Sequence, residues 1–408
     1  MSGDLDPEVL ELSELLATAK GPPPSLEEWD AGEDQEPIPP RQWLLGNVIC
    51  RRFVSSLLAD GGTGKTALRV AQALALATGR NLTGENVFQR CRVLLVSLED
   101  DRDELRRRVR AAQLHHGIAH EDIQGWLFLS APGGKAGKLM TLDGRGRPTV
   151  GGLVEALQQS IERNGIDVLC LDPFVKTHAL SENDNNQMDL VIESLASLAM
   201  EKNIAVDIPH HTAKGAIGPG NADRGRGASA IKDGARLVYT LTTMSEDEAD
   251  RFGIPHADRR LYLRTDSGKV NITPPAATAK WFKLVGVTLG NGDERYPSGD
   301  DVQTVEPWNP PDTWDGLTDD LVNRILTAIQ GGTPDGDRYS DAAAATTRAA
   351  WKVVQSHLPS KTKEQCREMI STWIRNGLLV RKVYHSAIDR KDREGLYLDE
   401  AKRPGWVS

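Results

Sequence analysis

The feature that most constrains this sequence is a glycine-rich loop between an apolar run and a helix-like run. The apolar run covers residues 53–59, the loop reads ADGGTGKT over residues 59–66, and the helix-like run covers residues 65–78. Glycines let a backbone wrap closely around a phosphate chain with its N–H groups pointing inward, and the N-terminus of the following helix adds partial positive charge. A glycine-rich turn that contained Gly-Lys-Thr by chance would not require an apolar strand before it and a helix after it. The pattern therefore predicts a phosphate-binding loop.

The loop residues have separate expected tasks. Lys65 is expected to reach the β- and γ-phosphates of ATP, and Thr66 to ligate Mg²⁺. Position 59 is alanine, where the motif usually begins with glycine. The residues expected to bind the nucleotide are Gly61, Gly62, Thr63, Gly64, Lys65, Thr66 and Ala67.

Strand-like and helix-like runs alternate through the first three quarters of the chain. Strands are expected at 53–59, 92–98, 167–172, 203–208, 235–242, near 260–264 and at 280–287, and helices at 65–78, 102–116, 151–163 and 187–202. Apolar strands separated by helices favour a mostly parallel sheet covered on both faces. The expected class is therefore α/β.

Two carboxylates follow apolar strand-like runs. Asp172 ends one run and is the candidate Walker B residue, holding Mg²⁺ through water, although a helix-capping Asp would look the same. Glu99 ends another run and is the candidate base for the attacking water. A catalytic glutamate on a strand other than the Walker B strand indicates the RecA-like group. Asp100 and Asp101 are expected to cap the next helix.

In combination these motifs resemble a known family. They are the phosphate loop, SLEDD at residues 97–101 before an arginine-rich helix, Asp172, PHHTAKG at 209–215, RGASA at 226–230 and DGAR at 233–236. The set resembles RepA-type plasmid replicative helicases and the AAA_25 ATPases of phages and mobile elements. More distantly it is similar to DnaB-type hexameric helicases. The resemblance covers about residues 38–290 and implies a RecA-like P-loop ATPase that uses ATP and Mg²⁺.

The resemblance also implies roles for residues beyond the phosphate loop. His211 matches the residue that senses the γ-phosphate and couples it to DNA, with His210 as a near alternative; an ordinary core or surface histidine is the plainer reading. The loop at 215–227 matches a channel loop that contacts single-stranded DNA, and the loop at 176–186 matches the second one. The implied DNA contacts near the first loop are Lys214, Arg224 and Arg226.

One arginine is expected to act in a neighbouring subunit. Arg236 matches the residue that family members insert into the next ATP site, where such a finger can raise the rate by ~10³–10⁵. Arg264 and Lys269 are competing candidates, and a salt bridge at a strand edge is the alternative for Arg236. A site completed in trans requires a homo-hexamer or another ring or filament.

Charge and composition divide the chain into four parts. The net charge of −9 is concentrated in residues 1–36, which hold eleven acidic residues and one basic residue. We expect an acidic disordered tail at 1–37, a RecA-like ATPase domain at 38–290, a linker rich in Pro, Gly and Asp at 291–315, and a small domain at 316–402. The four cysteines form no CxxC pair and no run is long enough to span a membrane, so buried reduced thiols in a cytoplasmic protein are expected.

The small C-terminal domain has the pattern of a winged helix. Helices are expected at 317–330, 342–358 and 362–376, followed by strands at 378–384 and 395–398 with a charged turn at 389–393. Residues 344–393 hold eleven basic and four acidic residues. In such modules the third helix enters the major groove and the wing contacts phosphate. The expected DNA contacts are Lys363, Arg367, Arg375 and Arg390, and the alternative is a protein-binding module.

Two functions compete at this point. The first is an ATP-driven motor on single-stranded DNA, a replicative-type helicase of a plasmid, phage or mobile element that works with replication-initiation partners. The second is an ATP-dependent DNA-binding or regulatory ATPase that recruits a replisome without unwinding. A small-molecule kinase is disfavoured by the placement of Glu99 and by the histidine loop.

Overall fold

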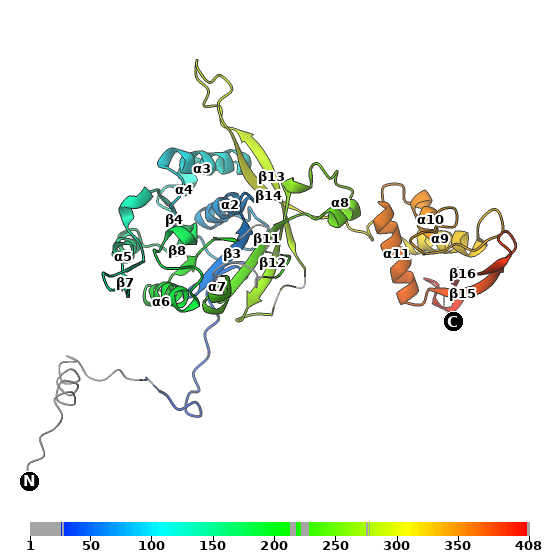
Figure 1. Ribbon diagram of the computed structural model, residues 1–408, viewed down its shortest axis with the longest axis horizontal. Coiled ribbons are helices and arrows are strands. Elements are labelled where there is room, and N and C mark those ends of the chain that lie inside the picture. The colour runs from blue at the N-terminus through cyan, green and yellow to red at the C-terminus, as the bar shows by residue number, and fades with distance from the viewer. Residues whose placement is uncertain are drawn as a thin grey trace, which may run out of the picture. The chain divides into compact units, whose positions relative to one another are not determined.

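A computed structural model of the chain describes residues 26, 28–212, 218–221, 228–274, 276 and 278–405 (Figure 1). Two compact units are distinguished, residues 1–41 and residues 42–408. The described residues of the first unit are all exposed. The second unit holds every helix and strand described below.

A large sheet forms the centre of the second unit. Among the described residues it has ten strands, nine of which follow one another in the order β14 (Asp301–Trp308), β13 (Lys280–Thr288), β12 (Tyr262–Val270), β11 (Leu237–Thr243), β3 (Val54–Asp60), β9 (Ala205–Asp207), β8 (Val168–Asp172), β4 (Val93–Ser97) and β5 (Leu127–Ser130). The tenth, β10 (His210–Thr212), follows β9 along the chain and also pairs with β3. The strands from β11 to β5 are parallel, and β12, β13 and β14 are antiparallel.

Helices cover both faces of the parallel part of this sheet (Figure 1). One face carries α2 (Lys65–Thr78), α3 (Arg102–His116) and the short α4 (His120–Ile123). The other carries α5 (Gly152–Asn164), α6 (Asn185–Glu201) and α7 (Ala228–Gly234). Because strand side chains alternate, Leu57 and Ala59 of β3 pack under α2 while Leu58 packs on the α5 and α6 side. This arrangement is the RecA-like α/β core that the sequence predicted.

Smaller elements complete the core. They are β1 (Trp43–Leu45), β2 (Ile49–Cys50), β6 (Met140–Leu142), β7 (Pro148–Val150), α8 (Glu246–Phe252) and the 3-10 turns η1 (Gly133–Ala136), η2 (Phe174–Lys176) and η3 (Arg259–Leu261). An aromatic cluster of Phe252, Tyr262, Trp281 and Trp308 fixes α8 against β13 and β14. The position of α8 matters because it borders the site described below.

Two stretches differ from what the sequence predicted. Residues 301–308 lie in the segment expected to be a linker but form β14, which pairs with β13 along its whole length. The strand was missed because its alternation of polar and apolar residues is short and because it contains Pro307. An edge strand tolerates proline. Residues 342–349 were expected to be helical, but the second C-terminal helix, α10 (Ala350–His357), begins only at residue 350. The preceding loop is fixed by two other hydrogen bonds. The backbone N–H of Ser340 donates to the carbonyl of Arg348 (2.7 Å), and the Arg348 side chain donates to the hydroxyl of Tyr384 (3.1 Å).

The C-terminal part has its own hydrophobic core. Three helices, α9 (Asp319–Gly331), α10 and α11 (Lys363–Arg375), pack with a hairpin of β15 (Leu379–Ser386) and β16 (Lys391–Leu398), and η4 (Glu400–Lys402) follows. Three helices followed by a hairpin were expected here. Whether the module works as a winged helix stays a prediction.

Two general expectations concern cysteines and membranes. All four cysteines are buried and carry free thiols, as predicted. Within the described ranges, none of the helices is both long and apolar enough to cross a lipid bilayer.

Candidate active site

The phosphate loop lies at the carboxyl end of β3, between that strand and α2. Gly62 and Gly64 have φ angles of 78° and 96°, which L-residues with side chains rarely adopt. A Cβ at Gly64 would also lie 2.9 Å from Leu263 Cδ1. Thr63 closes the turn by donating its hydroxyl to the carbonyl of Asp60 (2.8 Å). Glycine is therefore required by the backbone at positions 62 and 64 of this loop.

Thr66 and Asp172 meet at the start of α2. Thr66 Oγ1 donates to Asp172 Oδ2 at 2.7 Å, although 106 residues separate the two in the chain. A hydroxyl and a carboxylate are oxygen ligands of the kind that Mg²⁺ prefers. The pair thus fits a magnesium ion in chemistry, and these two residues would hold it.

Lys65 is a buried charge beside that pair. Its side chain is 3% exposed, and Nζ lies 4.0 Å from Asp172 Oδ1. Within the described ranges, Nζ has no hydrogen-bond partner. Burial lowers the pKa of Lys65 to about 8, against the attraction of Asp172 and Glu99. An unsatisfied ammonium at a helix N-terminus fits an anionic ligand such as a triphosphate.

Glu99 reaches the same place from the next strand. Ser97 of β4 lies opposite Asp172 of β8, and Leu98 N bonds the Asp172 carbonyl at 2.9 Å. Glu99 follows directly, with a side chain that is 48% exposed and 3.9 Å from the imidazole of His211. A half-exposed carboxylate near the phosphate loop can accept a proton from water.

His211 and His210 point to opposite faces of the sheet. β10 pairs with β3 so that His211 lies beside Ala59, next to the phosphate loop. Burial lowers the pKa of His211, and the charge of Lys65 lowers it further. His210 is buried on the other face, with its ring 5.8 Å from that of Phe174. Of the two histidines, the structure therefore places His211 at the site.

The two acids after Glu99 have different partners. Asp101 caps α3 by accepting from the backbone N–H of Glu104 at 2.7 Å, which confirms the prediction for this residue. The same prediction was wrong for Asp100. Its carboxylate accepts two hydrogen bonds, at 2.9 and 3.2 Å, from the side chain of Arg108. Arg108 lies in α3, one helical turn after Glu104. The Asp100 side chain thus holds α3 through its surface rather than through its N-terminus.

The candidates for action in a neighbouring subunit differ in what holds them. Arg264 is held by both oxygens of Asp266 (2.7 and 2.8 Å) and by Glu248. Lys269 Nζ lies 3.4 Å from Asp233 Oδ1. Arg236 is exposed at the start of β11, and within the described ranges its guanidinium has no polar partner. Arg236 is thus the most available of the three.

The expected DNA contacts fall into two groups. Lys214, Arg224 and Arg226 lie outside the described residues. In the C-terminal part, Lys363, Arg367 and Arg375 are spaced by four and eight residues and so lie along one side of α11, and Arg390 is exposed in the hairpin turn. Arg375 also donates to Thr372 Oγ1 at 2.9 Å.

A hollow of about 390 Å³ borders the phosphate loop on the side of β11, away from Asp172 and Glu99. It is lined by Asp60, Thr63, Pro219, Leu241, Thr242, Thr243, Ser245 and Glu248. No motif in the sequence had marked this hollow, because its walls come from the end of β3 and the loop after it, from Pro219, from the end of β11 and from the start of α8. Only the sheet order brings them together.

A match to a protein-family model supports the class of the site. A family model described as "AAA domain", AAA_25, matches residues 21–216, which include the phosphate loop, Glu99, Asp172 and His211. Among solved structures, a KaiC-like protein from the hyperthermophilic archaeon Pyrococcus horikoshii OT3 aligns with 15% identity and a TM-score of 0.40, over 64% of this chain and 94% of that chain. The family match, the sheet and the geometry of the site define an ATPase of the RecA-like P-loop class.

Proposed function

We propose that this ATPase is a motor on single-stranded DNA, a replicative-type helicase that resembles RepA-type and DnaB-type enzymes and works as a homo-hexamer or another ring. One observation carries the proposal. His211, 3.9 Å from Glu99, lies in β10, and this strand runs directly into the segment that contains Lys214, Arg224 and Arg226. A change at the γ-phosphate position would reach a basic segment through a single short strand.

Hydrolysis follows from the side chains around the phosphate loop. Mg²⁺, when bound, neutralises charge on the phosphate oxygens. Lys65 supplies a second positive charge from a buried position, where its field is little screened. Glu99 orients the attacking water and accepts its proton. Arg236 of another copy would supply the remaining charge, which makes the rate depend on assembly.

The nucleoside has a natural place on the other flank of the loop. Asp172, Glu99 and His211 all lie on the β8 side of Lys65, so the γ-phosphate end points that way. The base and ribose would then extend into the hollow of about 390 Å³ beside β11. Its hydroxyl groups, from Thr242, Thr243 and Ser245, suit a ligand with several hydrogen-bonding atoms.

A second function is favoured by the C-terminal module. Three bases along one side of α11 with Arg390 on the hairpin suit docking on duplex DNA, which a regulatory or replisome-recruiting ATPase would use without unwinding. The two functions separate in one pair of assays. ATPase activity is measured without DNA, with single-stranded DNA and with duplex DNA, and unwinding is measured on a forked duplex. Stimulation with unwinding supports the motor, and stimulation alone supports the second function. No response to any nucleic acid contradicts both.

The assignment of Glu99 can be tested in the same assays. Glu99→Gln is expected to lower kcat by ~10²–10⁴, the range for loss of a general base, while ATP still binds. Glu121→Gln, at an exposed position on α4, is the matched control and should keep wild-type turnover. Full turnover in Glu99→Gln would show that another residue activates the water.

A further inference from the structure

A buried carboxylate beneath the active site is contacted from three directions. Asp207 on β9 is 1% exposed, and its Oδ1 accepts from Arg69 Nη2 of α2 and from Ser55 Oγ of β3, both at 2.7 Å. Its Oδ2 lies 3.7 Å from Cys170 Sγ of β8. These four residues, the Asp207 cluster, join one helix and three neighbouring strands through a single side chain.

Three members of the cluster lie close in sequence to residues of the ATP site. Arg69 is one helical turn after Lys65 and Thr66, Cys170 is two residues before Asp172, and Asp207 is four residues before His211. Residues two apart in a strand share a face, so Cys170 lies directly behind Asp172 on the α2 side. A shift of Asp207 would therefore be passed to the elements that carry the Mg²⁺ ligands and the γ-phosphate sensor.

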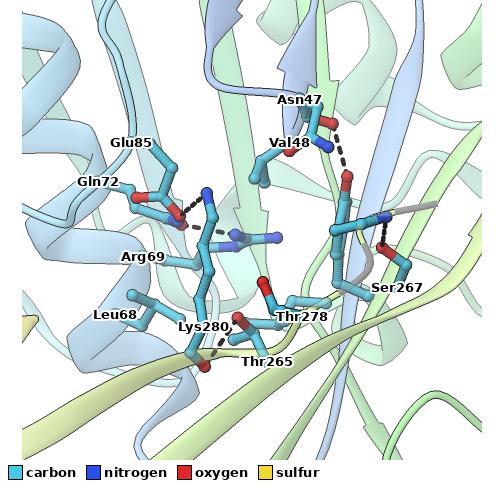
Figure 2. Close-up of a pocket in the computed structure, with 13 residues that line it drawn as sticks. Asn47, Val48, Leu68, Arg69, Gln72, Glu85, Thr265, Ser267, Thr278 and Lys280 are labelled. Carbon is cyan, nitrogen blue, oxygen red and sulfur yellow. Dashed lines mark hydrogen bonds and ion pairs between the residues drawn. The ribbon is translucent and has the colours of Figure 1, made fainter. Parts of the chain in front are cut away.

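Arg69 is fixed from its other side as well. Its Nη1 donates to Gln72 Oε1 at 2.6 Å, and the side chain is 3% exposed. Figure 2 shows Arg69 reaching from α2 into a small cavity beside the Glu85–Lys280 ion pair, which spans 3.3 Å. The cavity has about 30 Å³, room for roughly one water molecule. The guanidinium is thus held by two side chains, Gln72 and Asp207, at the edge of this cavity.

Stability alone does not account for such a pair. Burying two charges costs much of what their attraction returns, and apolar replacements of both partners are often neutral or stabilising. Burial indeed raises the pKa of Asp207, against the opposing effects of the Arg69 charge and the hydrogen bond from Ser55. What the pair does supply is a direct link between α2 and β9, which the bonds from Ser55 to Asp207 and from Arg69 to Gln72 hold in place on both sides.

We propose that Asp207 and Arg69 are positioning residues for ATP hydrolysis, which set the place of the phosphate-loop helix relative to Asp172 and His211. The inference deepens the ATPase assignment and does not depend on a DNA partner. It predicts that removing the pair leaves a folded protein that binds nucleotide but turns it over slowly.

The test is a double replacement by apolar residues of similar size. Arg69→Met with Asp207→Leu is expected to lower kcat at least ~10-fold, because a misplacement of about 1 Å can cost ~10²-fold in rate. The Kd for Mg·ADP should change by less than about 3-fold, because the phosphate-loop amides remain. Activity is measured without DNA, so the result is independent of whether the protein is a DNA motor.

A second ion pair in the same sheet provides a matched control. Arg51 and Asp167 form an Arg–Asp pair of 2.5 Å at the amino end of β8, the end opposite to Asp172, with side chains 13% and 22% exposed. Arg51→Met with Asp167→Leu should keep kcat within about 2-fold of the wild type. An equal loss of kcat in this control would overturn the proposal, because an ion pair remote from the ATP site would then matter as much.

Two further outcomes decide the proposal. A folded Arg69→Met, Asp207→Leu protein with wild-type kcat would overturn it. If that protein does not fold, Ser55→Ala decides, since it removes one hydrogen bond from an uncharged hydroxyl to Asp207 and leaves the ion pair intact. Ser55→Ala is expected to lower kcat about 2- to 10-fold at unchanged Kd for Mg·ADP, and an unchanged kcat would refute the positioning role.

Discussion

Lys65 should make the nucleotide-free protein less stable than a variant that lacks the charge. The ammonium is 3% exposed, and burial lowers its pKa from the ordinary 10.5 to about 8. At about 1.4 kcal/mol per pKa unit, this difference corresponds to ~3 kcal/mol against the charged form in the folded state. Lys65→Met keeps the length of the side chain and removes the charge, so it is expected to stabilise the protein by up to that amount at pH 7.

The pH dependence has a definite sign. At pH 7 Lys65 is protonated in the folded and unfolded states, and the folded state carries the full cost of the buried charge. Between about 8 and 10.5 the unfolded chain binds the proton more tightly, so the wild type gains stability as the pH rises. Methionine does not titrate. The advantage of Lys65→Met should therefore shrink steadily from pH 8 upward and vanish near pH 10.5.

Thermal unfolding of nucleotide-free protein at pH 7 and pH 9.5 measures both effects. At ~2–4 °C per kcal/mol for a domain of about 150–250 residues, Lys65→Met should raise Tm at pH 7 by up to roughly 6–12 °C, and by clearly less at pH 9.5. Lys176→Met, at an exposed position in the same core, should not change Tm. Mg·ADP should stabilise the wild type but not Lys65→Met. A Lys65→Met protein no more stable than the wild type at pH 7 would refute the reasoning.

Two further predictions concern the phosphate loop and the subunit contact. Gly64→Ala is expected to lower stability by ~1–3 kcal/mol, because its φ of 96° strains any L-residue and the added Cβ meets Leu263; Gly61→Ala, with open space around it, should keep its Tm in thermal unfolding. Arg236→Ala is expected to lower kcat by ~10³ or more at concentrations where the protein assembles, with an unchanged Kd for ATP. Arg264→Ala should instead lower Tm, because it leaves the carboxylates of its two partners unpaired. A wild-type kcat for assembled Arg236→Ala would remove it as the trans residue.

Local sequence determined the chemistry of the site. A glycine-rich loop after an apolar strand, and acids at the ends of two more strands, are short-range patterns that a sequence displays directly. The residues Lys65, Thr66, Asp172 and Glu99 were predicted from such patterns, and the structure brings them to one edge of the sheet. The α/β class followed in the same way from the alternation of strand-like and helix-like runs. Helix 102–116 agrees with α3 at both ends, because Asp101 caps its start and Gly117 follows its end.

Contacts between distant segments were decided by the tertiary structure. β14 looked like a linker because an edge strand needs few apolar residues, and its pairing with β13 is not written in its own sequence. Nothing in the local sequence marked Asp207 as the partner of Arg69. The two residues are 138 positions apart in the chain, and only the order of the strands in the sheet brings them together. The same holds for Arg264, which the structure pairs with Asp266 of β12 and Glu248 of α8. The sequence did not show that Arg264 is paired in this way and that Arg236 is the more available of the two. Periodicity and turn chemistry act over a few residues, whereas strand order and burial depend on the whole chain. Strand order and burial therefore decide which charged side chains form ion pairs and which stay available for binding or catalysis.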